Sequence, residues 1–218
     1  MLKKLAIFDL DGTIVDAFDS IYETISFICD KLNLKKFDYL TVKKAVGSGD
    51  LKLMSNLFKD EEIIKLSHTL YRENYLRFLK GNVKVIDGTF DLFEELKRRN
   101  IKIALATNRS RFSLIPLLEE TKLKNFFDFL VCADDVRKIK PDPEMILKII
   151  EEFKFKKNDV FYVGDMMIDY LAGKNAGIDT FIVLTGVSDK KDFENINEVL
   201  IFENLFKLKN FLIDNKLI

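Results

Sequence analysis

The sequence has little of the chemistry on which several large enzyme classes depend. It contains no tryptophan, one histidine (His68) and two cysteines (Cys29 and Cys132). A single histidine excludes a multi-histidine zinc site, and no serine–aspartate pattern around His68 supports a Ser-His-Asp triad. The cysteines stand in apolar stretches without a CxxC partner, so we expect buried thiols in a reduced, cytoplasmic protein rather than catalytic groups.

An excess of one charge and long apolar runs are also missing. Lys and Arg together number 35, as do Asp and Glu, so the formal net charge is zero. Nucleic-acid-binding domains usually carry a basic excess, so we expect no nucleic-acid partner. No apolar stretch is long enough to cross a bilayer, and the start MLKKLAIFDLDG is a poor signal peptide because its short apolar run ends in acids. We therefore expect no membrane partner.

What the sequence does contain is a regular alternation of apolar strands and helical segments. Continuous apolar runs predict strands at residues 5–8, 101–106, 129–132, 160–163, 180–184 and 200–202. Helical patterns lie between them at residues 89–99, 112–119, 143–153 and 168–176, and a last helix follows the final strand. Such alternation predicts an α/β fold, with a Rossmann-like parallel sheet covered by helices on both faces.

A purely helical stretch interrupts this alternation after the first strand. Helices are predicted at residues 16–33, 41–46, 51–58 and 61–79, and no strand pattern occurs within residues 16–80. In the first helix, Phe18, Ile21, Ile25 and Ile28 recur at the three- and four-residue spacing of one helical face. We therefore expect two domains: an α/β core from residues 1–15 and 82–218, and a small all-helical cap from residues 16–81.

Polar residues of a consistent kind follow the predicted strands, at the edge where open parallel sheets bind ligands. They are Asp9 and Asp11, Thr107 and Asn108, Lys140, Gly164 and Asp165, and Asp169. Taken singly, each group has a plain structural explanation, such as a capped turn, a helix N-cap or a surface lysine. Their occurrence together and in this order favours a single catalytic site.

The chemistry open to this set is narrow. Carboxylates converging on one edge repel one another unless a cation lies among them, and oxygen ligands without His or Cys favour Mg²⁺. Lys140 and Thr107 could hold a phosphate. A carboxylate that faces a phosphoryl group can attack it and form an aspartyl phosphate, and a second acid could move the proton.

The strings FDLDGTIVD, ATN, KPDP and GDMMID resemble, in this order, the four motifs of the haloacid dehalogenase superfamily. The resemblance implies that Asp9 is the nucleophile and Asp11 the acid/base. It also implies that the remaining motif residues bind phosphate (Thr107, Asn108, Lys140), hold Mg²⁺ (Asp9, the Asp11 backbone carbonyl, Asp165) or support the site (Gly12, Thr13, Gly164, Asp169).

Within that superfamily the chain is most similar to phosphoglycolate phosphatases. The stretch VGSGDLKLM resembles their substrate-specificity loop, which implies substrate contacts from Gly47, Ser48 and Gly49; a simple helix break is the alternative. The lead substrate is 2-phosphoglycolate, a small phosphorylated metabolite. Two departures, Met166 where relatives often have Ser or Thr and Arg109-Ser110 where many have Lys-Pro, leave the proposed catalytic groups unchanged.

Other functions on the same fold stay open. They are a pyrophosphatase, a haloacid dehalogenase, a sugar phosphomutase and a non-enzymatic partner-binding protein. Asp11 argues against a dehalogenase, because those enzymes generally lack the second aspartate. Gly49-Asp50 stands where phosphomutases carry a cap arginine. The chain is compatible with a monomer or a homodimer.

Overall fold

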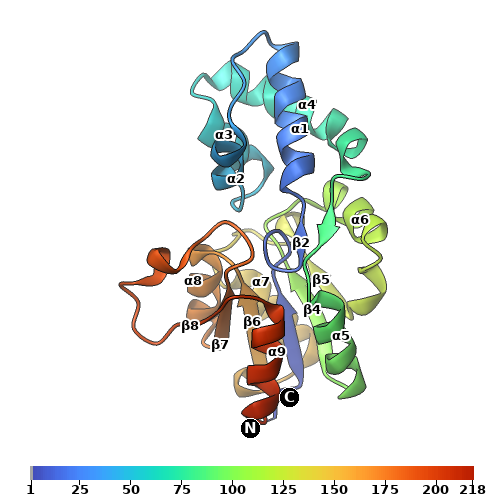
Figure 1. Cartoon of the computed structure of the whole chain (residues 1–218), viewed down its shortest axis with the longest axis vertical. Helices are drawn as coiled ribbons and strands as arrows, with labels where there is room; N and C mark the ends of the chain where they lie inside the picture. The colour runs from blue at the N-terminus through green and yellow to red at the C-terminus, as the bar shows by residue number, and fades with distance from the viewer. Residues whose placement is uncertain (1) are drawn as a thin grey trace.

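A six-stranded parallel sheet with helices on both faces forms the centre of the computed structural model, which describes residues 2–218 (Figure 1). All neighbouring strands pair in parallel. Their order across the sheet is β5 (Phe129–Val131), β4 (Lys102–Ala106), β1 (Leu5–Phe8), β6 (Val160–Gly164), β7 (Asp179–Val183) and β8 (Leu200–Phe202). The α/β class predicted from the sequence is thus confirmed.

The central strand β1 shows why these strands are continuous apolar runs. All four of its residues are fully buried, and successive side chains point to opposite faces of the sheet. Ala6 and Phe8 join the apolar cluster on one face, with helices α5 (Thr89–Arg98), α6 (Arg111–Glu120) and α9 (Leu205–Asp214). Leu5 and Ile7 join the cluster on the other face, with α7 (Glu144–Phe153) and α8 (Met167–Ala176).

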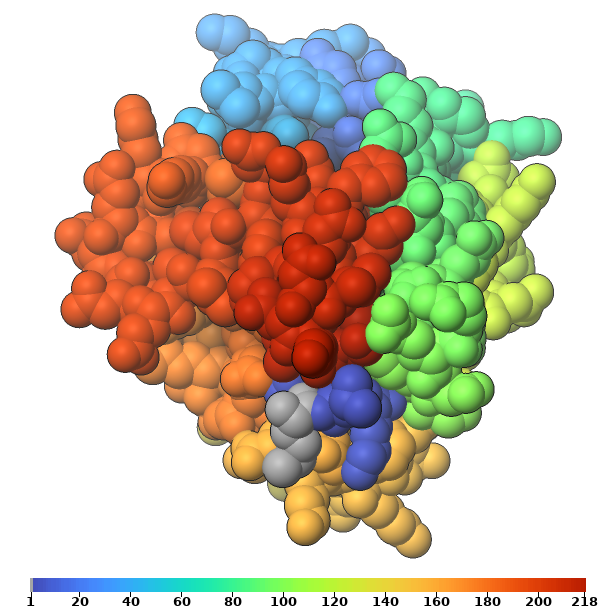
Figure 2. Space-filling model, turned by 60° about the horizontal axis from the view of Figure 1, so that its bottom comes forward, coloured from blue at the N-terminus to red at the C-terminus, as the bar shows by residue number. Residues whose placement is uncertain are grey.

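The first described residues and the C-terminal residues lie together, at the end of the sheet away from the helical cap (Figure 1). The backbone N–H of Lys3 donates to the carbonyl of Leu217 at 2.7 Å. In Figure 2 the C-terminal segment, in red, lies against the green segment that contains α5. Four short 3₁₀ helices complete the core: Lys124–Phe126, Ala133–Asp135, Lys157–Asp159 and Lys190–Phe193.

Four of the helices between β1 and β4 form an all-helical cap beyond the carboxyl edge of the sheet (Figure 1). They are α1 (Phe18–Lys31), α2 (Tyr39–Ala45), α3 (Asp50–Leu57) and α4 (Glu61–Leu79). The longest, α4, begins where the Asp60 carboxylate accepts hydrogen bonds from the N–H groups of Glu62 and Ile63 at 2.9 and 3.0 Å. Its Tyr71 and Tyr75 rings stack on each other with centroids 5.2 Å apart, and both are buried.

The two chain segments that join cap and core form a small antiparallel ribbon. Strand β2 (Val15–Asp16) pairs with β3 (Lys84–Val85). The prediction that no strand occurs within residues 16–80 is therefore wrong at Asp16. Two residues are too short to show a strand period, and the pairing arises only because the ends of the cap segment are held side by side. The exact domain limits at residues 15–16 and 81–82 stay a prediction.

Two further expectations concern the thiols and the membrane. Cys29 and Cys132 are both free and buried, as predicted. Among the helices of residues 2–218, none combines the length and apolar character that a membrane crossing requires.

Candidate active site

The site forms where the order of the sheet reverses. From β1 the chain adds β4 and β5 on one side, then returns to place β6 on the other side of β1. Asp9 directly follows β1 and Asp165 directly follows β6, and the N–H of Asp9 donates to the carbonyl of Val163 at 2.8 Å. Parallel pairing therefore brings together two carboxylates that are far apart in the sequence, at the usual ligand-binding position of open α/β sheets.

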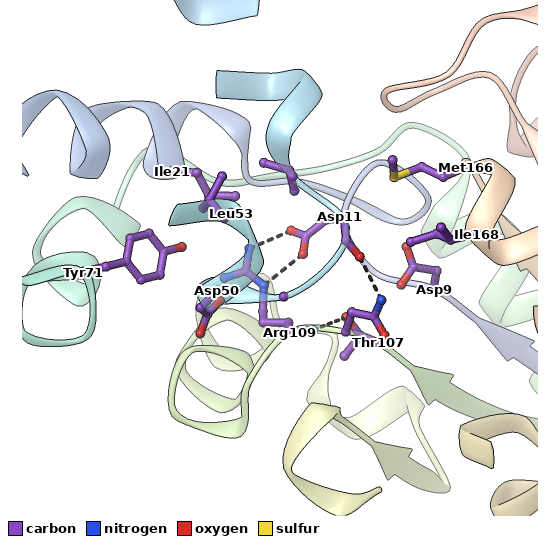
Figure 3. A pocket seen from close by; sticks show the side chains of 14 residues that line it. Asp9, Asp11, Ile21, Asp50, Leu53, Tyr71, Thr107, Arg109, Met166 and Ile168 are labelled. Atoms are coloured by element: carbon purple, nitrogen blue, oxygen red, sulfur yellow. Dashed lines mark hydrogen bonds and ion pairs between the residues drawn. The ribbon is translucent and has the colours of Figure 1, made fainter. Parts of the chain in front are cut away.

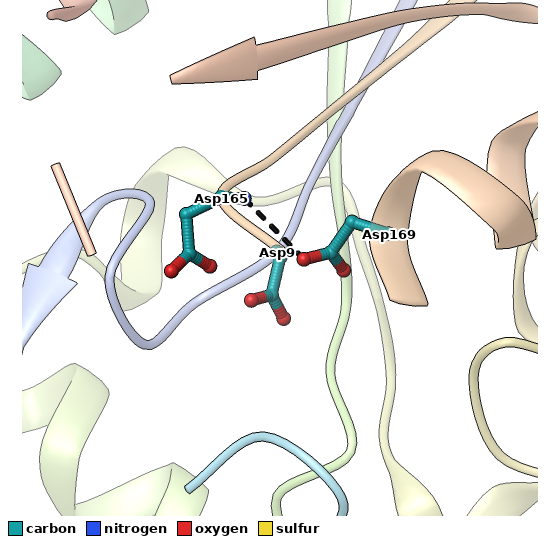
Figure 4. A group of neighbouring side chains, drawn as sticks. All are labelled: Asp9, Asp165 and Asp169. Atoms are coloured by element: carbon teal, nitrogen blue, oxygen red, sulfur yellow. Dashed lines mark hydrogen bonds between the residues drawn. The ribbon is translucent and has the colours of Figure 1, made fainter. Parts of the chain in front are cut away.

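Asp9, Asp165 and Asp169 converge on one buried point (Figure 4). One carboxylate oxygen from each lies within 4.8 Å of the others. Burial raises the pKa of Asp9 to about 7, against the opposing charge of Lys140, and Asp169 raises it further. Burial and the charge of Asp169 also raise the pKa of Asp165 well above its usual range. These oxygen donors fit a hard divalent cation, which would offset the repulsion among them.

The Lys140 ammonium is the positively charged group that contacts this cluster. Its Nζ donates to Asp9 Oδ1 at 2.5 Å, to Asp169 Oδ1 at 2.8 Å and to Tyr162 Oη at 2.9 Å. Burial by itself lowers the pKa of Lys140, but the charges of Asp169 and Asp9 outweigh it and hold the pKa above the usual range. Tyr162 was not predicted as a site residue, since nothing in the apolar run of β6 distinguishes it from core packing.

Backbone groups pack closely around Asp165. Its Oδ2 accepts a hydrogen bond from the N–H of Val187 at 2.8 Å, and the Thr13 hydroxyl lies 3.4 Å from Oδ1. Gly12 has φ +84°, and a Cβ placed there would lie 2.5 Å from Asp165 Oδ2. A Cβ on Gly186 would also overlap this carboxylate, a contact that the sequence analysis missed. Only glycine therefore leaves room for the carboxylate here.

Asp169 is held by the start of α8. Its Oδ2 accepts hydrogen bonds from the N–H groups of Met166 at 3.0 Å and Asp165 at 3.3 Å. A Cβ on Gly164 would overlap the Asp169 side chain. Of the predicted supporting residues, Asp169 belongs to the carboxylate cluster and Gly12, Thr13 and Gly164 lie beside it. Their supporting roles stay predictions.

The turn after β4 brings Thr107 and Asn108 to the same edge. Thr107 Oγ1 accepts a hydrogen bond from the N–H of Arg109 at 3.1 Å. The Asn108 amide donates to the carbonyls of Gly47 at 2.9 Å and Lys140 at 3.1 Å, and its oxygen accepts from the N–H of Lys140 at 2.9 Å. Asn108 therefore connects the lysine loop to the cap, and its contact with phosphate stays a prediction.

The Asp11 carboxylate lies apart from the three-carboxylate cluster and pairs with Arg109 (Figure 3). Arg109 Nε donates to Oδ2 at 3.0 Å, and Nη2 donates to Oδ1 at 2.7 Å. The sequence analysis treated Arg109 only as a departure from the family pattern. A basic residue two positions after Thr107 was the available signal, because that residue must also lie near the carboxyl edge of the sheet.

The cap loop closes over this edge. Gly47 and Gly49, with φ of +120° and +85°, line a cavity together with the catalytic candidates, and their contact with a substrate stays a prediction. The cavity has a volume of only ≈ 30 Å³. Its lining comprises Asp9, Asp11, Ile21, Val46, Gly47, Gly49, Asp50, Leu53, Tyr71, Thr107, Asn108, Arg109, Met166 and Ile168. Hydrogen bonds between core and cap, from the Asn108 amide to the Gly47 carbonyl and from Arg109 to the Tyr75 hydroxyl, hold the cap against this edge, so the cap is closed.

Ser48, the remaining residue of the predicted loop, lines a separate and wider groove. This groove of ≈ 570 Å³ adjoins the closed cavity, because Gly49, Asp50 and Asn108 line both. Three basic side chains of the cap also line it, namely Lys52, His68 and Arg72. The groove therefore offers positive charge beside the closed cavity.

Comparisons with known proteins agree with this arrangement. The family model for haloacid dehalogenase-like hydrolases matches residues 6–183. A phosphoglycolate phosphatase of Nitrosospira multiformis is 25% identical over 211 residues, covering 94% of this chain and 93% of the relative. Pyrophosphatase PpaX of Halalkalibacterium halodurans is 28% identical over 179 residues, covering 81% of each chain.

Solved structures show the same fold. A predicted phosphoglycolate phosphatase from Haemophilus somnus superposes with a TM-score of 0.88 at 20% identity, covering 96% of this chain and 97% of the other. CbbY from Rhodobacter sphaeroides, in complex with phosphate, gives 0.80 at 18% identity, with 95% and 96% covered. The fold, the matched residues and the named relatives together establish that this chain is an enzyme of the haloacid dehalogenase-like hydrolase family, related to phosphoglycolate phosphatases.

Proposed function

We propose that the protein is a Mg²⁺-dependent phosphatase that forms an aspartyl phosphate on Asp9, with 2-phosphoglycolate as the lead substrate. The observation that carries this proposal is the position of the Asp9 carboxylate. It lies buried between Lys140 and the carboxylates of Asp165 and Asp169, and it also lines the cavity under the cap. This environment suits a carboxylate that attacks a bound anionic group.

In the first step, an Asp9 carboxylate oxygen attacks phosphorus and the ester P–O bond breaks. Asp11 gives its proton to the departing oxygen, so an alcohol leaves and an acyl phosphate remains on Asp9. Lys140 and the Thr107 hydroxyl orient the phosphoryl oxygens. When bound, Mg²⁺ would supply positive charge to the transferring phosphoryl group, held by Asp9, Asp165 and the Asp11 carbonyl.

In the second step, Asp11 takes a proton from water while the water oxygen attacks phosphorus. The bond between phosphorus and the Asp9 oxygen breaks, which releases inorganic phosphate and restores the carboxylate. Asp169 is not consumed; it holds the Lys140 ammonium beside Asp9. The cap loop lies over the cavity and is hydrogen-bonded to the core, so the cap must open for binding and release.

The substrate assignment draws on the relatives. Several are named phosphoglycolate phosphatases and match nearly the whole chain. Pyrophosphate is the second candidate, because other relatives are named pyrophosphatase PpaX and because Lys52, His68 and Arg72 line the adjoining groove. A second phosphate would suit that groove better than a glycolate group does.

The proposed setting is the cytoplasm, with a small phosphorylated metabolite as the partner. Buried, unpaired cysteines support a reducing compartment. The balance of 35 basic and 35 acidic residues supports the absence of a nucleic-acid partner.

The decisive experiment measures phosphate release by the purified protein with Mg²⁺. We expect hydrolysis of 4-nitrophenyl phosphate that is lost on chelation and falls by at least about 10³ in Asp9→Asn, because the nucleophile is gone. Equal activity of Asp9→Asn and the unaltered protein would contradict the proposal. A panel of phosphorylated metabolites and pyrophosphate, compared by kcat/KM, then assigns the substrate.

A further inference from the structure

Arg109 occupies a position that the phosphatase mechanism leaves unexplained. It is the one basic side chain among the lining residues of the closed cavity, and only 3% of its side chain is exposed. Two of its nitrogens bind the two oxygens of Asp11, so the carboxylate is held at two points. Such a fork fixes both the distance and the plane of the carboxylate.

The third nitrogen of Arg109 connects this pair to the cap. Nη1 donates to the hydroxyl of Tyr75 on α4 at 2.8 Å, and Arg109 Cζ lies 5.1 Å from the centre of the Tyr75 ring. The same hydroxyl lies 3.1 Å from the Ser20 hydroxyl on α1, so it joins the two longest cap helices. Asp11 belongs to the core loop after β1, and its position is therefore tied to the cap through a single guanidinium.

The neighbours of Arg109 bind the cap as well, but without reaching Asp11. Asn108 donates to the Gly47 carbonyl at 2.9 Å, and the Ser110 hydroxyl donates to the Asp50 carboxylate. Three consecutive side chains thus contact the cap, the outer two at residues 47–50 and the middle one on α4. Only the middle one also holds the proposed acid/base, which distinguishes Arg109 from a residue that merely docks the cap.

We infer that Arg109 is a positioning residue that aligns the Asp11 carboxylate for proton transfer when the cap closes, with Tyr75 as the cap group that sets the Arg109 side chain. The inference rests on the proposed function, because it assigns Arg109 a role through Asp11. Each oxygen of Asp11 retains a further lone pair, so the fork leaves room for the proton that Asp11 must carry.

The dependence of kcat/KM on the basicity of the leaving group tests this role. A residue that only docks the cap would not change that dependence. Proton donation matters most for a basic leaving group and least for a leaving group that departs as a stable anion. Phenyl phosphate and 4-nitrophenyl phosphate are similar in shape, but phenolate is the more basic leaving group. Because kcat/KM reports steps up to departure of the leaving group, the ratio of the two kcat/KM values isolates the acid step.

The test compares Arg109→Lys and Tyr75→Phe with the unaltered protein, using the Mg²⁺-loaded full chain. We expect Arg109→Lys to lower kcat/KM for phenyl phosphate about tenfold more than for 4-nitrophenyl phosphate, a part of the ~10²–10⁴ that acid–base help supplies. Tyr75→Phe removes one hydrogen bond and keeps the ring, so we expect a selective loss of about threefold to fivefold. The Ser20 hydroxyl keeps its bond to the Ala17 carbonyl at 2.7 Å in that variant.

Ser110→Ala is the matched control. It removes a neighbouring bond between cap and core that does not lead to Asp11, so we expect both substrates to lose the same factor. Asp11→Asn is the reference for complete loss of the acid and should show the largest selective loss on phenyl phosphate. Thermal unfolding of each variant checks that it is folded at the assay temperature.

Two results would overturn the inference while the proposed function stands. One is a selective loss in Asp11→Asn but equal losses on both substrates in Arg109→Lys and Tyr75→Phe. The other is faster phenyl phosphate hydrolysis in those two variants, which would make the Asp11–Arg109 pair a restraint. If Asp11→Asn itself shows no selective loss, the acid role in the proposed function fails first.

Discussion

Asp9 and Asp11 stand two residues apart, yet the fold gives their carboxylates different neighbours. Asp9 contacts the ammonium of Lys140 and lies beside Asp165 and Asp169, whereas Asp11 pairs with the guanidinium of Arg109. Two carboxylates in different environments are the usual basis for dividing nucleophilic and acid–base roles. At the residue scale, the two aspartates thus differ in the basic side chain that each contacts, and the proposed division of roles follows this difference.

Lys140 allows a prediction on stability. Lys140→Met leaves the buried Asp9 and Asp169 without their cation, and breaking a buried ion pair from one side costs about 3–5 kcal/mol. We expect the metal-free variant to unfold at a correspondingly lower urea concentration. Lys138→Met, at an exposed lysine 3.9 Å from Asp142, should change the free energy of unfolding by less than about 0.5 kcal/mol. Similar values for the two variants would contradict a structural role for the Lys140 ion pairs.

Gly12 allows a second prediction, with Gly81 as its control. Both have positive φ, +84° and +79°, so alanine at either position costs about 1–2 kcal/mol in backbone strain. Only at Gly12 would the new Cβ meet Asp165 and Gly186, whereas nothing lies within 4 Å of a Cβ at Gly81. We expect Gly12→Ala to lose about 10² in kcat, since small displacements at a reacting centre are that costly, and Gly81→Ala to keep its activity. Equal kcat values would contradict the close-packing argument.

At the scale of elements, the ends of β1, β4 and β6 are followed by Asp9, Thr107 and Asp165, and residues of the cap line the cavity from the opposite side. Helix α4 is central, since it contributes Tyr71 to the cavity and Tyr75 to the Arg109 contact. Its start depends on Asp60, the N-cap residue, rather than on the core. The position of these two tyrosines is therefore sensitive to local helix stability.

The contribution of the N-cap residue Asp60 to the stability of α4 can be tested directly. Asp60→Ala removes the acceptor for the N–H groups of Glu62 and Ile63, and we expect a loss of about 1 kcal/mol in the free energy of unfolding. Asp60→Asn keeps an acceptor oxygen and should lose only a fraction of that amount. Urea unfolding followed by circular dichroism measures both variants. An Asn variant as unstable as the Ala variant would show that the hydrogen bonds are not the cause.

At the scale of the whole molecule, the sheet edge and the cap enclose three carboxylates whose mutual repulsion only one cation of residues 2–218, the Lys140 ammonium, offsets. A ligand that binds only the folded protein raises its stability, and the gain grows with the logarithm of the ligand concentration above Kd. Metal binding should therefore stabilise the entire fold and not the loop alone. The loops after β1 and β6 both contribute carboxylates, so the effect reaches the centre of the sheet.

We expect Mg²⁺ at about 100 times its Kd to raise Tm by roughly 5–10 °C, from about 2.7 kcal/mol of added stability. Asp165→Asn should abolish this shift, because it removes one of the three converging carboxylates. Asp214→Asn, at an exposed acid on α9, should retain it. Differential scanning calorimetry with and without the metal measures the shift in Tm for each variant. An undiminished shift in Asp165→Asn would place the metal elsewhere.

The sequence by itself determined the elements and most of the site, because both depend on local pattern. Apolar runs locate the strands to within one or two residues, and parallel pairing then places whatever follows each strand at one edge. Asp9, Thr107 and Asp165 could be assembled in this way before any coordinates, whereas Lys140 was placed by its motif, just before a helix. The buried cysteines could be predicted for the same reason, since they stand within apolar stretches.

Only the tertiary structure decided which side chains meet across the cavity. Arg109 and Asp11 are 98 residues apart, and Arg109 and Tyr75 are 34 apart. The approach of Gly186 to Asp165 and the pairing of β2 with β3 likewise join distant segments. No local period records such contacts, because they arise from how the cap is set on the sheet. Local pattern therefore predicts the edge where chemistry occurs, while packing selects the partners there.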